Sequence, residues 1–205
     1  MSFLKNTTSF TRFNVAEDVN SEIMDNLEAK LRQFAFIDID ETADEQGAGW
    51  TSYDDMLDTQ FEKSSPRKGE FITFSYRIDT RRISPAVQKK YVTLAVRAEE
   101  EKLAELGKKY ISKDRKKEIV EQVKLRLRAK TLPVPAYFEV VWDYPNKILY
   151  FASTQRSVID KFSEYFVRTF DVAIEQILPY TLAQNILGKG CEEQLDQLEP
   201  TEFNA

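Results

Sequence analysis

Two consecutive helices are predicted by the stretch from Ser84 to Lys130, which reads SPAVQKKYVTLAVRAEEEKLAELGKKYISKDRKKEIVEQVKLRLRAK. Ser84 and Pro85 are typical of a helix start. A serine hydroxyl accepts a hydrogen bond from a free backbone amide, and proline loses no hydrogen bond at the first helical position. The first helix is expected to end at Leu106, because Gly107 can adopt the left-handed conformation that terminates helices.

The second helix is predicted to begin after Ser112, which caps it, and to end at about Lys130 because Pro133 and Pro135 follow. With a rise of about 1.5 Å per residue, each helix is roughly 27 to 33 Å long. We therefore expect residues 81–132 to form a two-helix arm that projects from the rest of the fold.

Positive charge is concentrated in and around this arm. From Arg77 to Lys130 the sequence contains 17 Lys or Arg and 8 Asp or Glu, whereas the rest of the chain contains 12 and 26. The net charge of −5 is therefore an average over two opposite surfaces. Because a cationic surface binds polyanions by releasing their counterions, the asymmetry favours double-stranded DNA as a partner.

The composition excludes most standard enzyme chemistry. Of the 205 residues, 42% are hydrophobic and 12% aromatic, which is enough for a folded core in one or two domains. There is no histidine and Cys191 is the only cysteine, so His-dependent catalytic triads and the usual zinc sites are excluded. No apolar run is long enough to cross a bilayer, and the first residues do not resemble a secretory signal. We expect a cytoplasmic binding protein without catalytic residues, metal or cofactor.

The residues before the arm predict a β-α-β-β unit over 1–80. A strand is expected from Thr8 to Val15, then a helix that Asp18 or Asn20 caps, then a second strand from Phe34 to Asp40. The apolar stripe of this helix is formed by Ile23, Leu27, Leu31 and Phe34.

Residues 41–69 predict a long loop, with at most a short hairpin, because glycine, proline and acidic residues recur there. Trp50 is interpreted as a loop anchor that packs on the core, and stacking on DNA is the alternative. From Glu70 to Ile78 apolar residues alternate with Thr73, Ser75 and Arg77, which predicts a strand with one side facing water.

The residues after the arm predict a β-β-α-β-α unit over 133–188. Its expected elements are a hairpin, a helix, a strand and a short helix that Gly188 closes. They span Tyr137 to Tyr144, Lys147 to Ser153, Gln155 to Phe170, Val172 to Leu178 and Thr181 to Leu187. Residues 189–205 predict an acidic mobile tail. The predicted fold class is α+β, with antiparallel or mixed sheets flanked by helices in two cores, one on each side of the arm.

Two sets of basic residues on the arm are candidates for DNA contact. On the second helix a basic row is expected to point away from an apolar stripe, and this stripe is expected to contact a similar one on the first helix. The stripes are Val120, Val123 and Leu127 on the second helix, and Val87, Tyr91, Leu94 and Ala98 on the first. Arg97 and four other cations lie at or near the start of the first helix, where the helix dipole also attracts phosphate.

The candidate DNA-binding residues are Arg81, Arg82, Lys89, Lys90, Lys113, Lys117, Lys124 and Arg128. No cluster of Asn or Gln accompanies the arginines, so we expect binding to backbone phosphates that is independent of sequence. A solvated charged face without a ligand is the commoner meaning of such a row.

Two other functions are weighed against DNA binding. Asp38, Asp40 and Glu41 suggest a metal-dependent nuclease, with Asp54 and Asp55 as further ligands. The helical arm also suits a protein-interaction module that docks on a partner.

The order of these elements resembles the RdgC family of bacterial recombination-associated DNA-binding proteins. The likeness covers most of residues 8 to 188 and is clearest from Arg81 to Thr154. Its motifs are Pro85 and Val87, Lys113 to Lys117, Leu132-Pro133, Trp142-Asp143, Leu27 to Leu31 and Gly49-Trp50.

The resemblance implies non-specific binding of double-stranded DNA by a ring-shaped homodimer, without a catalytic step. It also implies association with the nucleoid and control of the access of the RecA recombinase to DNA. Family members continue well beyond the position of Gly188, and that part contributes to ring closure. A different dimer or a C-shaped clamp is therefore the alternative for this sequence.

Overall fold

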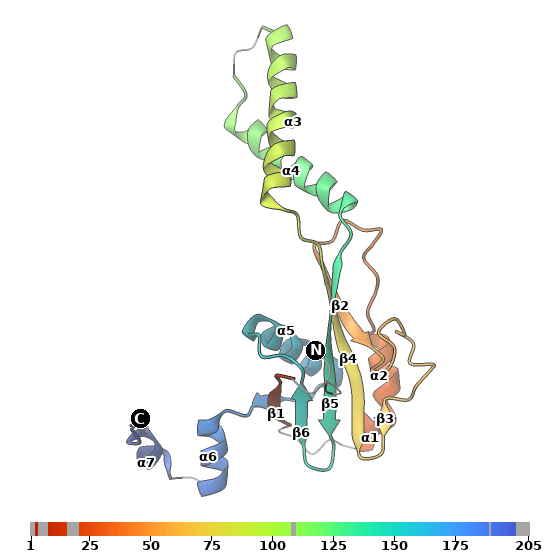
Figure 1. The fold of residues 1–205 in the computed structure, drawn as a ribbon, viewed down its shortest axis with the longest axis vertical. Helices are drawn as coiled ribbons and strands as arrows, with labels where there is room; N and C mark the ends of the chain where they lie inside the picture. Colours follow the sequence, from red (N-terminus) through yellow and green to blue (C-terminus); the bar gives the residue numbers. More distant parts are fainter. Residues whose placement is uncertain (1–2, 4–7, 16–20, 108–109, 189, 200–205) are drawn as a thin grey trace.

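One antiparallel sheet of seven strands forms the centre of the computed structural model, which describes residues 3, 8–15, 21–107, 110–188 and 190–199 (Figure 1). The strands follow the order β2-β4-β5-β6-β1-β7, and β3 pairs with β4 beside this path. Their bounds are β1 Thr11–Val15, β2 Gln46–Thr51, β3 Arg67–Lys68, β4 Phe71–Thr80, β5 Val134–Asp143, β6 Ile148–Phe151 and β7 Ile174–Gln176. With seven described helices around the sheet, the α+β class is confirmed.

The helices are α1 Ser21–Asp25, α2 Leu27–Gln33, α3 Pro85–Glu105, α4 Lys113–Lys130, α5 Arg156–Phe170, α6 Pro179–Leu187 and α7 Glu192–Asp196. Those from α3 to α6 agree with the sequence to within a few residues. Gly107 and Gly188 have positive φ angles of 71° and 85°, as their helix-ending role requires. The Ser112 side chain accepts a hydrogen bond from the amide of Arg115, as a cap should, whereas the Ser84 side chain makes no such bond.

The two predicted cores are one. Strands β4 and β5 pair along ten residues each, from Phe71 opposite Asp143 to Thr80 opposite Val134. The arm is therefore an insertion between two directly paired strands, and it projects from one end of them (Figure 1). The expectation of two cores was wrong because this long-range pairing has no local signal in the sequence.

Aromatic side chains fill the core between the sheet and α5. Phe162, Phe166 and Phe170 lie on one face of α5 and are fully buried. Trp50 is also fully buried, and its ring contacts Phe162 and Phe170, among others. Its indole Nε1 donates a hydrogen bond to Thr169 Oγ1 over 2.9 Å. Trp50 is thus a central core residue in a strand, not a loop anchor.

The strand predicted from Phe34 to Asp40 is wrong, and the edge strand β2 occurs where a loop was expected. Residues 34–40 make only an isolated bridge, between Ala35 and Trp50. A Cβ atom on Gly49 would lie 2.3 Å from the Phe36 Cα atom, so this glycine permits a close backbone crossing. Phe36 and Ile39 are buried, which explains their apolar character without a strand.

Two further predictions for residues 21–80 differ from the structure. The single helix predicted here is divided at Asn26 into α1 and α2. The side of β4 expected to face water is buried, with Thr73 at 7% exposure and Ser75 at 4%. The irregular chain from 52 to 66 covers it, and the Thr73 amide donates to the Pro66 carbonyl over 2.7 Å. The proposed caps Asp18 and Asn20 lie outside the described residues.

The acidic tail contains an ordered element in its described part, the short helix α7. It follows α6 at the end of the molecule opposite the arm (Figure 1). Residues 189 and 200–205 of the predicted tail lie outside the described residues.

Candidate nucleic-acid interface

The two arm helices contact each other through a small apolar cluster. Ile119, Val123 and Leu127 are the buried residues of α4. Their neighbours are Ile83, Tyr91, Val92, Ala95 and Val96. The stripe predicted on α3 was therefore wrong apart from Tyr91, and Val87 and Leu94 are 42% and 50% exposed. The error arose because α3 carries apolar residues at helical spacing on two sides, and only one side meets α4.

The observed buried stripe determines which way the basic row on α4 points. At about 100° per residue, Lys113, Lys117, Lys124 and Arg128 lie roughly 80° to 140° round the helix from the centre of the buried stripe, so the row flanks the stripe. Lys124 and Arg128 are accordingly only partly exposed. The side of α4 opposite α3 carries the acidic residues Asp114, Glu118 and Glu121. The basic row therefore points only partly away from the contact with α3, with Lys113 and Lys117 exposed and Lys124 and Arg128 half-buried.

Three cations of the row have acidic partners. Lys124 Nζ lies 2.8 Å from Glu121 Oε1, and Lys117 Nζ lies 4.0 Å from Asp114 Oδ1. Arg128 Nη2 lies 2.5 Å from Glu45 Oε2, which connects α4 to the start of β2. Exposed pairs of this kind are weak, but each one places a carboxylate beside the cation, and that carboxylate would repel a phosphate. Lys113 is exposed and has no ion-pair partner among the described residues.

Arg81 occupies a structural position between the arm and the sheet. Only 4% of its surface is exposed, and no ion pair between described residues involves it. Its guanidinium donates to five backbone carbonyl oxygens, those of Ile39, Asp40, Asp44, Arg128 and Thr131. Two of these belong to the end of α4, where the last carbonyls lack helical partners. Arg81 therefore fixes the arm to the 39–44 segment and has no exposed donor for DNA.

The remaining candidates gather on the side of α3 that faces away from α4. We call this the outer α3 surface, formed by Ala86, Lys89, Lys90, Thr93, Leu94 and Arg97. These residues line a shallow, open depression of about 450 Å³. Its three cations are exposed, and none forms an ion pair with a described residue. Arg82, just before α3, is also exposed and unpaired among the described residues.

Acidic residues limit this surface. Glu100, Glu101 and Glu105 are exposed near the end of α3, where Lys102 is the one cation of the last turn, so negative charge exceeds positive charge there. Arg97 lies on the same side of α3 as Lys90, two turns later, and that spacing of seven residues was the available signal for adding it to the candidate set.

Arg115 joins the two helices at the far end of their contact. Its Nε lies 2.7 Å from Glu99 Oε1 and its Nη1 lies 2.9 Å from Glu118 Oε2. The hydrogen bond from Arg115 lowers the pKa of the Glu99 carboxyl, and the bond from Glu99 raises the pKa of the guanidinium. Arg115 thus serves the arm's own structure.

The residues of the nuclease alternative do not form a metal-binding group. The Asp38 carboxylate accepts a hydrogen bond from the Asp40 amide over 2.7 Å. Among the residues that the structure describes, no three Asp, Glu, His or Cys side chains lie close enough together to hold a metal ion.

The sequence matches no family model and no curated protein. None of the described helices is long and apolar enough to cross a membrane.

Proposed function

We propose that this protein binds double-stranded DNA independently of sequence, through the outer α3 surface. The observation that carries the proposal is the outer α3 surface, where Lys89, Lys90 and Arg97 are exposed and have no acidic partner among the described residues. Arg82 lies at the same end of the helix and is also exposed. Unpaired cations on a projecting element reach phosphates without first breaking an ion pair.

The start of α3 strengthens this surface. The first amides of a helix have no helical partner, and the helix dipole places partial positive charge there. Pro85 has no amide hydrogen, and the Gln88 amide donates to the Ser84 carbonyl over 3.0 Å. Because the Ser84 side chain makes no capping hydrogen bond, the amides of Ala86 and Val87 remain available to an anion. A phosphate at this end would meet both the amides and the Arg82 side chain.

The biological part of the proposal rests on the likeness of the sequence to the RdgC family. On that basis we propose a homodimer, associated with the nucleoid, that controls the access of recombination proteins to DNA and catalyses no reaction. Arg81, Lys117, Lys124 and Arg128 are not primary contacts in this proposal, because the first is buried and the others are paired.

The test is a titration of labelled 30-base-pair duplexes of two unrelated sequences, followed by fluorescence anisotropy at several salt concentrations. If about four phosphates are neutralised per chain, log affinity should fall with log salt at a slope near −3.6. Both duplexes should bind equally. Binding that is insensitive to salt, or no binding, would contradict the proposal.

A protein-interaction role for the arm is favoured by one observation, the exposure of Val87 and Leu94 beside the cations. A phosphate backbone offers no apolar group for these two side chains to contact, whereas a partner protein does. If the purified protein bound neither duplex, the protein-interaction role would be favoured over DNA binding. Duplex cleavage in the same mixture with magnesium would support the nuclease instead.

A further inference from the structure

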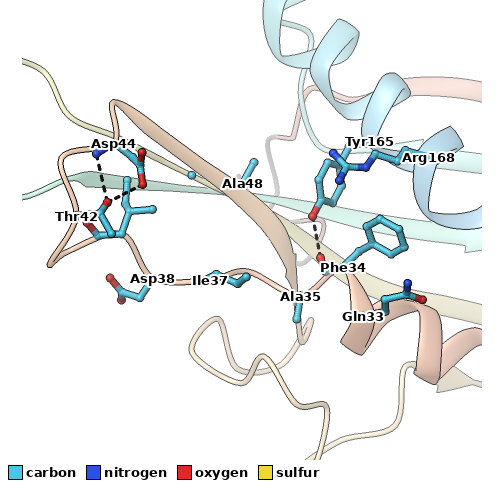
Figure 2. A pocket seen from close by; sticks show the side chains of 12 residues that line it. Gln33, Phe34, Ala35, Ile37, Asp38, Thr42, Asp44, Ala48, Tyr165 and Arg168 are labelled. Carbon is cyan, nitrogen blue, oxygen red and sulfur yellow. Dashed lines mark hydrogen bonds between the residues drawn. The ribbon is translucent and has the colours of Figure 1, made fainter.

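A cavity of about 600 Å³ lies against the free side of β2, and none of the arm cations lines it (Figure 2). One wall is formed by Tyr165 and Arg168 of α5, and the other by the segment from Ile37 to Asp44. Gly47 and Ala48 of β2 lie between the walls. A second cavity of about 260 Å³ shares Ala48, Tyr165 and Arg168 with the first. Together they form a groove along the strand.

The hydrogen bonds of β2 show which backbone groups face this groove. Strand β2 is at the end of the sheet and pairs with β4 on one side only. On its other side the Trp50 amide donates to the Phe34 carbonyl over 3.1 Å, and the Trp50 carbonyl accepts from the Phe36 amide over 2.9 Å. Residues 34–36 thus cover the second half of the free edge.

The first half of that edge is uncovered. Backbone groups of an antiparallel strand point alternately toward one neighbour and the other, so the amide and carbonyl of Ala48 point the same way as those of Trp50. The Glu45 carbonyl, three residues before Ala48, accepts the Arg81 amide on the β4 side, which agrees with this alternation. In the part of the chain that the structure describes, no backbone hydrogen bond outside the strand ladder involves Ala48.

Natural edge strands are usually protected by proline, inward charges, bulges or a covering segment. Here the residues at the uncovered position are small, and they leave the backbone accessible from the groove. On one face of the strand lies the Ile39 side chain, whose Cγ2 atom would be 2.8 Å from a Cβ atom on Gly47. On the other face stands Tyr165, whose hydroxyl donates to the Phe34 carbonyl over 2.9 Å. The groove is therefore walled on both faces and open along the strand.

Charge differs between the walls. On the α5 side Arg168 is exposed and has no ion-pair partner among the described residues, and Lys161 donates to the Gln46 side chain. Glu164 is the one acid on that side of the smaller cavity. Asp38 and Asp44 lie on the other wall. Because side chains of an extended chain alternate between faces, an acidic residue directed at α5 meets Arg168 while its neighbours face Ile39.

We propose that this groove binds an extended peptide segment of a partner protein, which adds to the sheet as a strand beside Ala48 and directs an acidic side chain at Arg168. Main-chain hydrogen bonds to Ala48 would supply affinity, and the α5 wall would supply the preference for acidic residues. The proposal is independent of DNA binding, because it uses none of the arm cations.

The test uses the full chain and an end-capped fluorescent pentapeptide, Glu-Val-Glu-Val-Glu, in which acidic residues occupy one face of an extended chain. We expect saturable binding, with amide chemical-shift changes centred on Gly47 and Ala48. Ala48→Pro removes the outward amide without removing a bond to β4, so binding should weaken at least tenfold in a folded protein. Arg168→Glu should weaken binding several-fold.

Two controls keep the test decisive if Ala48→Pro does not fold. The same peptide N-methylated at every backbone amide should not bind, and Lys117→Glu, on the arm, should bind the unmodified peptide as the natural chain does. Equal binding of the methylated and unmodified peptides would overturn the proposal. So would a peptide-free dimer that Ala48→Pro converts to a monomer, because the edge would then pair with a second copy of this chain.

Discussion

The longest of the described helices, α3, buries none of its 21 residues, whereas the 15-residue α5 buries five. The sheet and α5 share one core of nineteen buried apolar residues among those described, and the arm has a cluster of three. A region with so few buried contacts opens locally before the rest of the protein unfolds. The arm thus provides a charged surface. The sheet and α5, which we call the body, provide most of the buried contacts that stabilise the fold.

The largest expected effect belongs to the body. Phe166→Ala removes a fully buried ring that contacts Trp142, Phe162 and Phe170, and should lower the free energy of unfolding by about 3–5 kcal/mol. Urea denaturation followed by tryptophan fluorescence measures this loss. A change below about 1 kcal/mol would mean that α5 does not anchor the core.

The next effect concerns the connection between the two regions. Arg81→Met leaves several partly buried carbonyls without a donor and should cost about 2–3 kcal/mol. Because those carbonyls belong to the 39–44 segment and the end of α4, amide hydrogen exchange should increase there while α5 stays protected. Uniform loss of protection throughout the sheet would contradict the role of Arg81 as the joint.

A smaller effect is expected within the arm. Leu127→Ala should cost about 2 kcal/mol, near the lower end for a buried leucine, because the cluster around it is small and has room to adjust. Exchange should rise in α3 and α4 and remain unchanged in α5. If the global unfolding midpoint fell as far as in Phe166→Ala, the arm and the body would form one cooperative unit.

The smallest effect comes from the Arg115–Glu99 pair. The folded-state pKa of Glu99 is lowered, so its contribution is present above the unfolded pKa of about 4.3 and is lost as pH falls through the folded value. Arm exchange measured between pH 7 and pH 3, and corrected for the intrinsic rate, should show this loss. Glu99→Gln should remove the pH dependence without changing α5, and a pH response that persists in the variant would assign it to another group.

The sequence predicted those elements whose signals are local. Helix α5 has aromatic residues at helical spacing, and the arm helices have their start and stop residues within a few positions of each end. Gly47 and Gly49 were misinterpreted as loop residues, because a glycine needed for close backbone contact looks the same in sequence as one needed for a turn.

The candidate site was predicted less well for a related reason. Whether a lysine is available depends on partners that only the fold brings near, such as Glu45 for Arg128. In the same way, the two apolar sides of α3 give no local indication of which one meets α4. Lys89 and Lys90 remain in the candidate set because they lie on the side that does not.

We propose that unpaired cations on α3 bind duplex DNA, and that the paired α4 cations Lys117, Lys124 and Arg128 do not. The most direct measurement compares the duplex affinity of Lys90→Glu/Arg97→Glu with that of Lys117→Glu/Lys124→Glu, two variants with equal change in net charge. We expect the α3 variant to lose at least tenfold more affinity than the α4 variant, with a shallower salt slope and an unchanged unfolding midpoint. Equal losses in both variants, or a greater loss in the α4 variant, would contradict this proposal.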